Sequence, residues 1–106
     1  METPRKRRDR LYIIAEILVI AKDRSLKTQI MYRANLSFAQ LNEYLNFLIR
    51  RELLKRHIEN GKTVYKTTAK GVKYLENYEE ISNLLRRGKE NPFVANSPTF
   101  WLKRNP

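Results

Sequence analysis

The segment Lys27–Arg51 constrains the fold of this chain more than any other part of its sequence. Its apolar spacing predicts a short helix that ends near Ala34, a turn at 35–37 and a longer helix. Ser25 or Thr28 is expected to cap the short helix. A capping-box spacing, S-x-x-Q, predicts that the longer helix begins at Phe38. Three leucines on one line of the longer helix are predicted to pack inward: Leu41, Leu45 and Leu48.

A β-hairpin is predicted immediately after these helices. Two β-prone runs, 53–58 and 63–67, flank the residues Glu59-Asn60-Gly61-Lys62. Asn-Gly tolerates the positive φ angles of a two-residue hairpin turn, so the hairpin signal is strong. A helix-turn-helix can place its second helix in a DNA major groove while a hairpin contacts the backbone beside it. The pattern therefore favours nucleic-acid binding.

The charge of the chain also favours a polyanionic partner. Its 22 Lys and Arg residues against 11 Asp and Glu residues give a formal net charge of +11 over 106 residues. Solubility can be reached with less charge of either sign, so this imbalance indicates nucleic acid.

Apolar residues make up 42% of the chain, which is enough for the single core of one small domain.

Two further helices are expected around the helix pair. One runs from about Leu11 to Ala21 and carries two apolar rows, of which the second suggests contact with another helix or another subunit. The other begins near Thr68, and its apolar stripe drifts from the core toward a second surface, as a dimerising helix requires. A homodimer is expected, and a monomer with this helix folded back on the first is the alternative. The predicted dimerisation residues are Tyr74, Tyr78, Ile81, Leu84 and Leu85.

The outward face of the helix at 38–51 carries side chains that can recognise DNA bases. Asn, Gln and Arg can make paired hydrogen bonds to adenine and guanine edges, and a small Ala allows close approach. Glu43 can accept from cytosine or pair with a surface arginine, while Phe38 and Tyr44 on the flanks are expected to be half-buried. An ordinary solvated helix face is the alternative. The predicted recognition residues are Ser37, Ala39, Gln40, Asn42, Glu43, Asn46 and Arg50.

Basic side chains elsewhere are expected to contact the DNA backbone, which positions a protein without reading sequence. On the hairpin, Lys62 at the tip is the first choice, followed by Arg56 and Lys66, while His57 is expected to have no special role. The basic arm at 1–9, whose run of cations ends with Arg10, can follow a phosphate track or enter a minor groove, or it is a solvated terminus. The remaining predicted backbone contacts are Arg5, Lys6, Arg7, Arg8, Lys27 and Arg33.

Several classes of function find no support in these residues. The chain has no cysteine and a single histidine, so neither a disulfide framework nor a zinc site is expected. No Gly-rich phosphate loop, acid pair or nucleophile–histidine arrangement is evident, so catalysis, a cofactor or a small-molecule ligand is not expected. No run approaches the ~20 apolar residues of a membrane span, and the basic start lacks a secretory cleavage site. A cytoplasmic, nucleoid-associated protein is predicted.

Three segments carry a more specific pattern: RLYIIAEILVIAKD, KTQIMYRANLSFAQLNEYLNFLIRRELL and GKTVYKTTAKGVKYL. Together, from Arg10 to about Leu85, they resemble the small archaeal winged-helix DNA-binding transcription regulators. The resemblance implies a mainly helical winged helix-turn-helix with a small β-hairpin, commonly dimeric through the C-terminal helix. It implies a recognition helix at Ser37–Arg51 and a wing at Arg56–Lys66. One departure is that Glu52 stands where such proteins often have a glycine.

These patterns divide the chain into a basic arm (1–9), a winged helix-turn-helix domain (10–87, with the dimerisation helix at about 68–87) and a tail (88–106). The tail is expected to be disordered, or its aromatic residues clasp the body or a partner subunit. The predicted function is that of a dimeric regulator of transcription that binds double-stranded DNA. Two alternatives remain open: a chromatin-type or architectural DNA binder without sequence specificity, and a protein-interaction module in a larger assembly.

Overall fold

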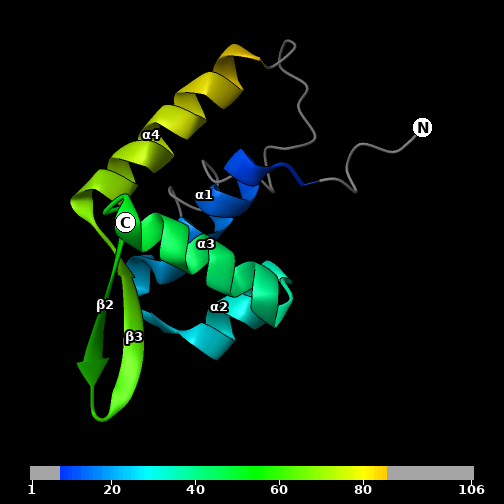
Figure 1. Cartoon of the computed structure of the whole chain (residues 1–106). Helices are drawn as coiled ribbons and strands as arrows, with labels where there is room; N and C mark the ends of the chain where they lie inside the picture. The colour runs from blue at the N-terminus through cyan, green and yellow to red at the C-terminus, as the bar shows by residue number, and fades with distance from the viewer. Residues whose placement is uncertain (1–7, 86–106) are drawn as a thin grey trace.

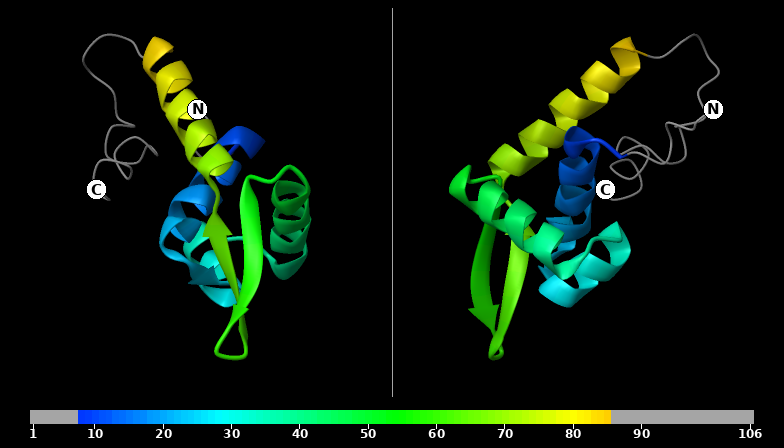
Figure 2. Two further views of the ribbon diagram at one scale, coloured as in Figure 1. Left: turned by 90° about the vertical axis from the view of Figure 1, so that its left-hand side faces the viewer. Right: turned by 45° about the vertical axis from the view of Figure 1, so that its right-hand side comes forward.

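The computed structural model describes residues 8–85, which form four α-helices and a three-stranded antiparallel sheet. Most of the helical body lies between the β2–β3 hairpin and the far end of α4, which extend in opposite directions (Figure 1, Figure 2). The predicted fold class is confirmed, whereas the expectations for the tail lie outside the described residues. The elements are α1 (Arg10–Ile20), the 3₁₀ turn η2 (Ala21–Asp23), β1 (Ser25–Leu26), α2 (Lys27–Ala34), α3 (Phe38–Arg50), β2 (Leu54–Glu59), β3 (Lys62–Thr67) and α4 (Ala69–Leu84).

Helix α1 forms the centre of the core because it is apolar over most of its circumference. The carboxylate of Asp9 caps its start by accepting a hydrogen bond from the Tyr12 amide at 2.8 Å. Its second apolar row is buried inside the domain, where α1 packs against α2, β3 and α4. Contact with other helices therefore accounts for that row without a second subunit. The buried residues of α1 are Ile13, Ile14, Ala15, Ile17, Leu18, Val19 and Ile20.

The sheet contains one strand that the sequence did not predict. Strand β1 pairs with β3 through Ser25↔Tyr65 and Leu26↔Val64, which gives the strand order β1-β3-β2. A strand of two residues is too short to show an alternating pattern, so only the fold reveals it. Because β3 lies in the middle, β1 fixes the base of the wing to the helical body.

The start of α2 differs from the prediction. Ser25 is buried, and its hydroxyl donates to the Ile20 carbonyl at 3.0 Å instead of capping the helix. Thr28 lies inside the first turn, so neither residue is the cap. The N-cap is Leu26, whose amide donates to the Gln29 side chain at 2.8 Å. An extended residue that still belongs to β1 thus begins the helix.

The hairpin closes as the sequence predicts. Asn60 and Gly61 both have positive φ angles, +52° and +77°, and Glu59 pairs with Lys62 on either side of them. Two successive positive φ angles define the turn whose twist matches that of antiparallel strands. The wing is therefore a tight ribbon that ends in a two-residue tip.

The end of α3 is joined closely to the start of α4. The Thr68 amide donates to the Leu53 carbonyl at 3.1 Å, and the Thr68 hydroxyl donates to the Glu52 carbonyl at 2.7 Å. One turn later, a Cβ on Gly71 would lie 2.6 Å from Cγ2 of Thr67 and even closer to the Leu53 carbonyl oxygen. Only glycine permits this approach, so the end of α3, the wing and α4 are fixed to one another at a single joint.

Candidate nucleic-acid interface

The turn between α2 and α3 sets the direction of the second helix. Asn35 adopts the left-handed conformation, with φ of +57°, which asparagine tolerates better than most residues. The Leu36 amide donates to the Met31 carbonyl at 3.1 Å, and the Asn35 amide to the Tyr32 carbonyl at 3.3 Å. This is the Schellman pattern, which satisfies the last carbonyls of α2 and ends the helix sharply.

Helix α3 begins at Phe38, with the predicted capping box in place. The Ser37 hydroxyl accepts from the Gln40 amide at 3.1 Å, and the Gln40 side-chain oxygen accepts from the Ser37 amide at 3.0 Å. Both residues were predicted to recognise bases, but these contacts occupy the hydroxyl and the amide oxygen. What Gln40 still offers to a base is its side-chain NH₂ group.

The inward face of α3 is the one that the sequence predicts, since Leu41, Leu45 and Leu48 are buried. The outward face is narrower than predicted, because Asn42, expected on it, is half-buried at its margin. The helix therefore presents a polar surface to solvent while its leucines hold it on the core. We call the exposed residues of this surface the recognition face: Ala39, Gln40, Glu43, Asn46 and Arg50.

Of the two aromatic residues expected to be half-buried on the flanks of α3, Tyr44 is half-buried and Phe38 is not. Phe38 is 61% exposed, because it lies in the first turn and no core element covers it. The Lys27 ammonium nitrogen lies 4.6 Å from the centroid of its ring. That distance is typical of a cation–π contact, which joins the start of α2 to the start of α3.

The exit from α3 uses a non-glycine residue, as the departure at Glu52 requires. Glu52 has φ of +64°, and its amide donates to the Ile49 carbonyl at 3.0 Å. The Leu53 amide donates to the Leu48 carbonyl at 2.9 Å, which completes a second Schellman pattern. The chain then enters β2 directly, so the wing starts beside the end of the recognition helix.

The strand register separates the basic side chains of the wing onto two faces. Arg56 lies opposite Tyr65 and next to a shallow groove between the end of α3 and the wing. Lys62 and Lys66 point to the other face, because side chains alternate along a strand. Lys62 is exposed at the tip, but the Lys66 ammonium donates to the Lys22 carbonyl at 2.7 Å. Of the three predicted wing contacts, Lys62 and Arg56 are thus exposed, and Lys66 is engaged within the domain.

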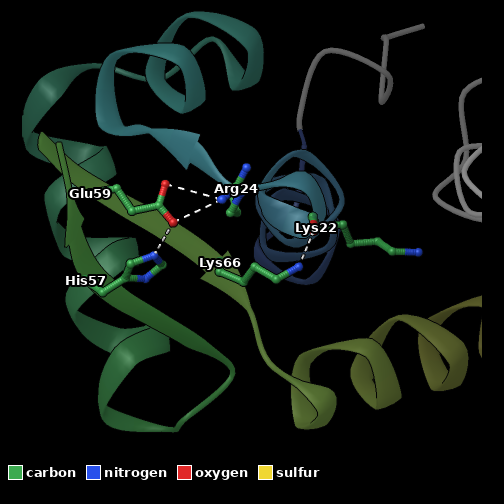
Figure 3. A network of polar contacts seen from close by, with 5 residues as sticks. All are labelled: Lys22, Arg24, His57, Glu59 and Lys66. Carbon is green, nitrogen blue, oxygen red and sulfur yellow. Dashed lines mark hydrogen bonds and ion pairs between the residues drawn. The ribbon is translucent and has the colours of Figure 1, made fainter.

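A polar network anchors the tip half of the wing to the helical body (Figure 3). The Arg24 guanidinium lies 3.0 Å from the Glu59 carboxylate, and His57 Nε2 lies 2.8 Å from the same carboxylate. The hydrogen bond with His57, together with the charge of Arg24, lowers the pKa of Glu59 below its ordinary value although partial desolvation opposes this. His57, expected to have no special role, therefore contacts the carboxylate that pairs the wing with Arg24.

The predicted backbone contacts outside the wing have different environments. Arg33 is exposed on α2, whereas Arg8 is engaged within the domain. The Arg8 guanidinium lies 2.7 Å from the Glu16 carboxylate and donates to the Asn35 carbonyl at 3.1 Å. Arg8 therefore connects α1 to the turn before the recognition helix. Arg5, Lys6 and Arg7 lie outside the described residues.

Two residues near α3, Tyr32 and Arg51, are not among the predicted DNA contacts, and Arg10 was expected only as part of the basic arm. Tyr32 on α2 is 86% exposed. Arg10 and Arg51 place their guanidinium groups near the ring of Phe47 on the flank of α3. The Phe47–Arg51 spacing of four residues is visible in the sequence and brings two helical side chains together. The approach of Arg10 from another helix has no such signal.

The apolar stripe of α4 divides into an inner and an outer part. Tyr74 and Tyr78 are half-buried, and the Tyr74 hydroxyl donates to the Leu11 carbonyl at 2.8 Å. Burial raises the pKa of both phenols above the ordinary value of tyrosine, and the nearby Asp9 raises them further. Ile81, Leu84 and Leu85 are exposed. Of the predicted dimerisation residues, the two tyrosines thus pack inside the domain and the other three face solvent.

Neither a metal centre nor a membrane span is found in the part of the chain that the structure describes. Within residues 8–85, no three His, Asp or Glu side chains come together in a way that could hold a metal ion. None of the helices in the same range combines the length and the apolar character that a membrane span requires.

The family model described as "Winged helix-turn-helix" matches residues 7–86, and this chain belongs to that family. Two uncharacterized proteins of the archaeon Methanocaldococcus jannaschii are similar in sequence. MJ0290 is 39% identical over 83 residues, which make up 77% of this chain and 37% of MJ0290. MJ0287 is 37% identical over an alignment of 68 residues, with a coverage of 58% of this chain and 70% of MJ0287. The chain therefore spans little more than a third of the first of these relatives.

Several solved structures share this fold. Sso10a-2, a DNA-binding protein from Sulfolobus solfataricus, is 24% identical with a TM-score of 0.54, over 76% of this chain and 99% of that chain. SSV1 F-93 is 20% identical with a TM-score of 0.55, over the same shares of the two chains. Lactococcus lactis ZitR in complex with DNA is 20% identical with a TM-score of 0.51, over 71% and 62%. At these identities the likeness concerns the fold alone.

Proposed function

We propose that this protein binds double-stranded DNA and regulates transcription as a homodimer, with α3 in the major groove and the wing against the backbone. The observation that carries the proposal is the recognition face, whose polar side chains are exposed on a helix held rigidly by three buried leucines. Asn46 and Arg50 can make paired hydrogen bonds to adenine and guanine. Glu43 can accept from cytosine N4, so the face can distinguish base pairs.

The charges around the recognition face support an anionic partner. The chain carries a formal net charge of +11, and exposed cations stand on α2 at Arg33 and on the wing at Lys62. Contacts of such side chains with phosphates supply affinity and fix the register of a protein on the duplex. The exposed lysine at the wing tip is suited to this task, since it is free of the contact that engages Lys66.

A selection of random duplexes at two salt concentrations tests the proposal. Wild-type protein is expected to enrich a sequence motif. Asn46→Ala is expected to change the preferred bases at one position, because it removes a base contact worth about 1–3 kcal/mol. Lys62→Ala is expected to weaken all sequences alike. Equal losses on selected and random duplexes for both variants would contradict base recognition by α3.

The high charge also favours a second candidate, an architectural binder that coats DNA without a sequence preference. A net charge of +11 on a small domain supplies strong attraction to any phosphate backbone. In that case the selection yields no motif, and affinity falls steeply with salt. Failure to bind any duplex at low salt would instead indicate a module that contacts another protein.

A further inference from the structure

We propose that Arg10 and Arg51, held near the ring of Phe47, bind phosphates of one DNA strand on the flank of α3 opposite the wing. This inference rests on the proposed DNA binding and adds a second backbone contact to it. Arg51 is not among the residues expected from the sequence to touch DNA, and Arg10 was expected to do so only as part of a flexible arm, whereas it begins α1. The ligand is the phosphodiester backbone of double-stranded DNA.

The two arginines converge on one aromatic ring, Arg10 from the start of α1 and Arg51 from the C-cap of α3. The guanidinium carbon of Arg51 lies 4.8 Å from the Phe47 ring centroid, and that of Arg10 lies 5.8 Å from it. Arg10 also lies 5.7 Å from the Tyr44 ring centroid. Both arginines are exposed, while Phe47 and Tyr44 are half-buried. The aromatic rings are fixed by the core and can hold two mobile side chains in place.

Contact with an aromatic ring leaves a guanidinium available to an anion. Arg8 and Arg24 are neutralised by carboxylates, Glu16 and Glu59 respectively. Within residues 8–85, Arg10 and Arg51 make no ion pair of this kind. A guanidinium over a ring keeps its N–H groups directed outward in a plane, which suits bidentate binding of a phosphate. Arg10 and Arg51 are therefore ordered but not neutralised.

The position of Phe47 decides which strand the pair can reach. At ~100° per residue, Phe47 lies about 60° from Arg50 on one side of the recognition face, and Ile49 lies about 100° away on the other side. Ile49 lines the groove at the base of the wing together with Arg56. A helix in the major groove has one strand on each flank. The wing therefore contacts one strand, and the Arg10–Phe47–Arg51 side contacts the other.

Affinity measured against salt concentration for a fluorescent duplex tests the pair. Arg10→Ala and Arg51→Ala are each expected to lower the magnitude of the log–log slope by about 0.9, which corresponds to roughly eightfold weaker binding at 0.1 M salt. Lys73→Ala is the control, because it removes an equal charge from an exposed position on α4. It is expected to leave the slope within about 0.3 of the wild-type value. Thermal unfolding verifies that each variant is folded.

Two further measurements separate the pair from a general charge effect. Phe47→Leu keeps both arginines and fills similar space, and it is expected to weaken binding severalfold because the guanidinium groups are no longer ordered. Uncharged methylphosphonates are placed at single positions of the duplex. When the phosphate that Arg10 contacts is made uncharged, Arg10→Ala is expected to bind no more weakly than the wild type, and the same holds for Lys62→Ala at its own phosphate. These two phosphates are expected to lie on opposite strands.

The outcomes distinguish this inference from the proposed function. If the wild type binds no duplex, the proposed function fails, and this inference fails with it. If Lys62→Ala has a smaller salt slope than the wild type while the variants of Arg10 and Arg51 retain the wild-type slope, only this inference is overturned. Two results would overturn the arrangement proposed for the pair. One is wild-type affinity for DNA in Phe47→Leu, and the other is that the phosphates contacted by Arg10 and Lys62 lie on the same strand.

Discussion

Glu52 occupies a backbone conformation that a side chain disfavours, because its φ of +64° places Cβ close to neighbouring backbone atoms. Glu52→Gly is expected to raise the free energy of unfolding by about 0.5–1 kcal/mol, since glycine meets no steric cost there. Chemical denaturation measures the difference. Asn35→Gly is the matched control at the other helix end, where φ is +57°. A smaller gain is expected there because asparagine tolerates this region, and a loss at Glu52 would mean that its side-chain contacts outweigh the strain.

Gly71 presents the opposite case, in which a side chain has no room. Gly71→Ala is expected to destabilise the protein by about 2–3 kcal/mol, because the added methyl group collides with Thr67 and the Leu53 backbone. For a domain of this size the thermal midpoint is expected to fall by roughly 10–20 °C. Asn77→Ala, at an exposed position of the same helix, is the control and is expected to leave the thermal midpoint almost unchanged. An unchanged midpoint in Gly71→Ala would show that α4 can shift away from α3.

Single residues differ in how far the sequence reveals their environment. The inward leucines of α3 could be predicted, since helical periodicity alone separates buried from exposed positions. Phe38 could not, because its exposure depends on whether another element covers the first turn of α3. The same limit applies to Lys66, which the pattern offers to a phosphate and which donates instead to a carbonyl 44 positions earlier in the chain. Contacts between distant segments decide these cases.

The wing is joined to the helical body through one carboxylate, that of Glu59. Glu59 accepts from His57 and pairs with Arg24, which lowers its pKa in the folded state. A lowered pKa means that the carboxylate stabilises the fold above the pKa of the unfolded chain, and that this stability is lost as the pH falls through the folded value. The hairpin is therefore expected to loosen in acid, below about pH 4.

Glu59→Gln tests this dependence on pH. At pH 6 the variant is expected to unfold at a lower temperature than the wild type, and the difference is expected to shrink as the pH falls through the lowered pKa of Glu59, where the wild-type carboxylate becomes protonated. Glu76→Gln removes an exposed carboxylate on α4 and is the control. A difference between Glu59→Gln and the wild type that stays constant as the pH is lowered until the wild type unfolds would exclude the carboxylate charge as its cause.

Elements with a local signal could be predicted, and those without one could not. Helix α3 has a capping box and three periodic leucines, and the wing has Asn60-Gly61, so both follow from short-range rules. Strand β1 exists only because β3 lies beside it. The same holds for the candidate interface. The exposed residues of α3 could be predicted from that helix alone, whereas the contact between Arg10 and Phe47 depends on how α1 lies relative to α3 in the fold.

At the scale of the whole molecule, α4 gives the domain an apolar surface with no cover in residues 8–85. The apolar stripe of α4 begins with Tyr74 and Tyr78. Tyr74 bonds to the Leu11 carbonyl of α1, and Tyr78 lies near Asp9 at the start of α1. Beyond it, Ile81 and Leu85 continue the stripe at 52% and 76% exposure. Apolar area in water costs about 25 cal/mol per Å². A second copy of the same helix can cover this area, which is the homodimer that we propose.

Ile81→Glu tests this dimer and its effect on DNA binding together. The variant is expected to sediment as a monomer, whereas the wild type sediments as a dimer, because a carboxylate cannot be buried without a partner. Asn83→Glu adds the same charge beside the stripe and is expected to remain dimeric. Since a dimer engages two sets of phosphates, the log–log salt slope of the monomeric variant is expected to be about half that of the wild type. A monomeric wild type, or a dimer that survives Ile81→Glu, would contradict an α4 interface and leave each winged helix to bind DNA alone.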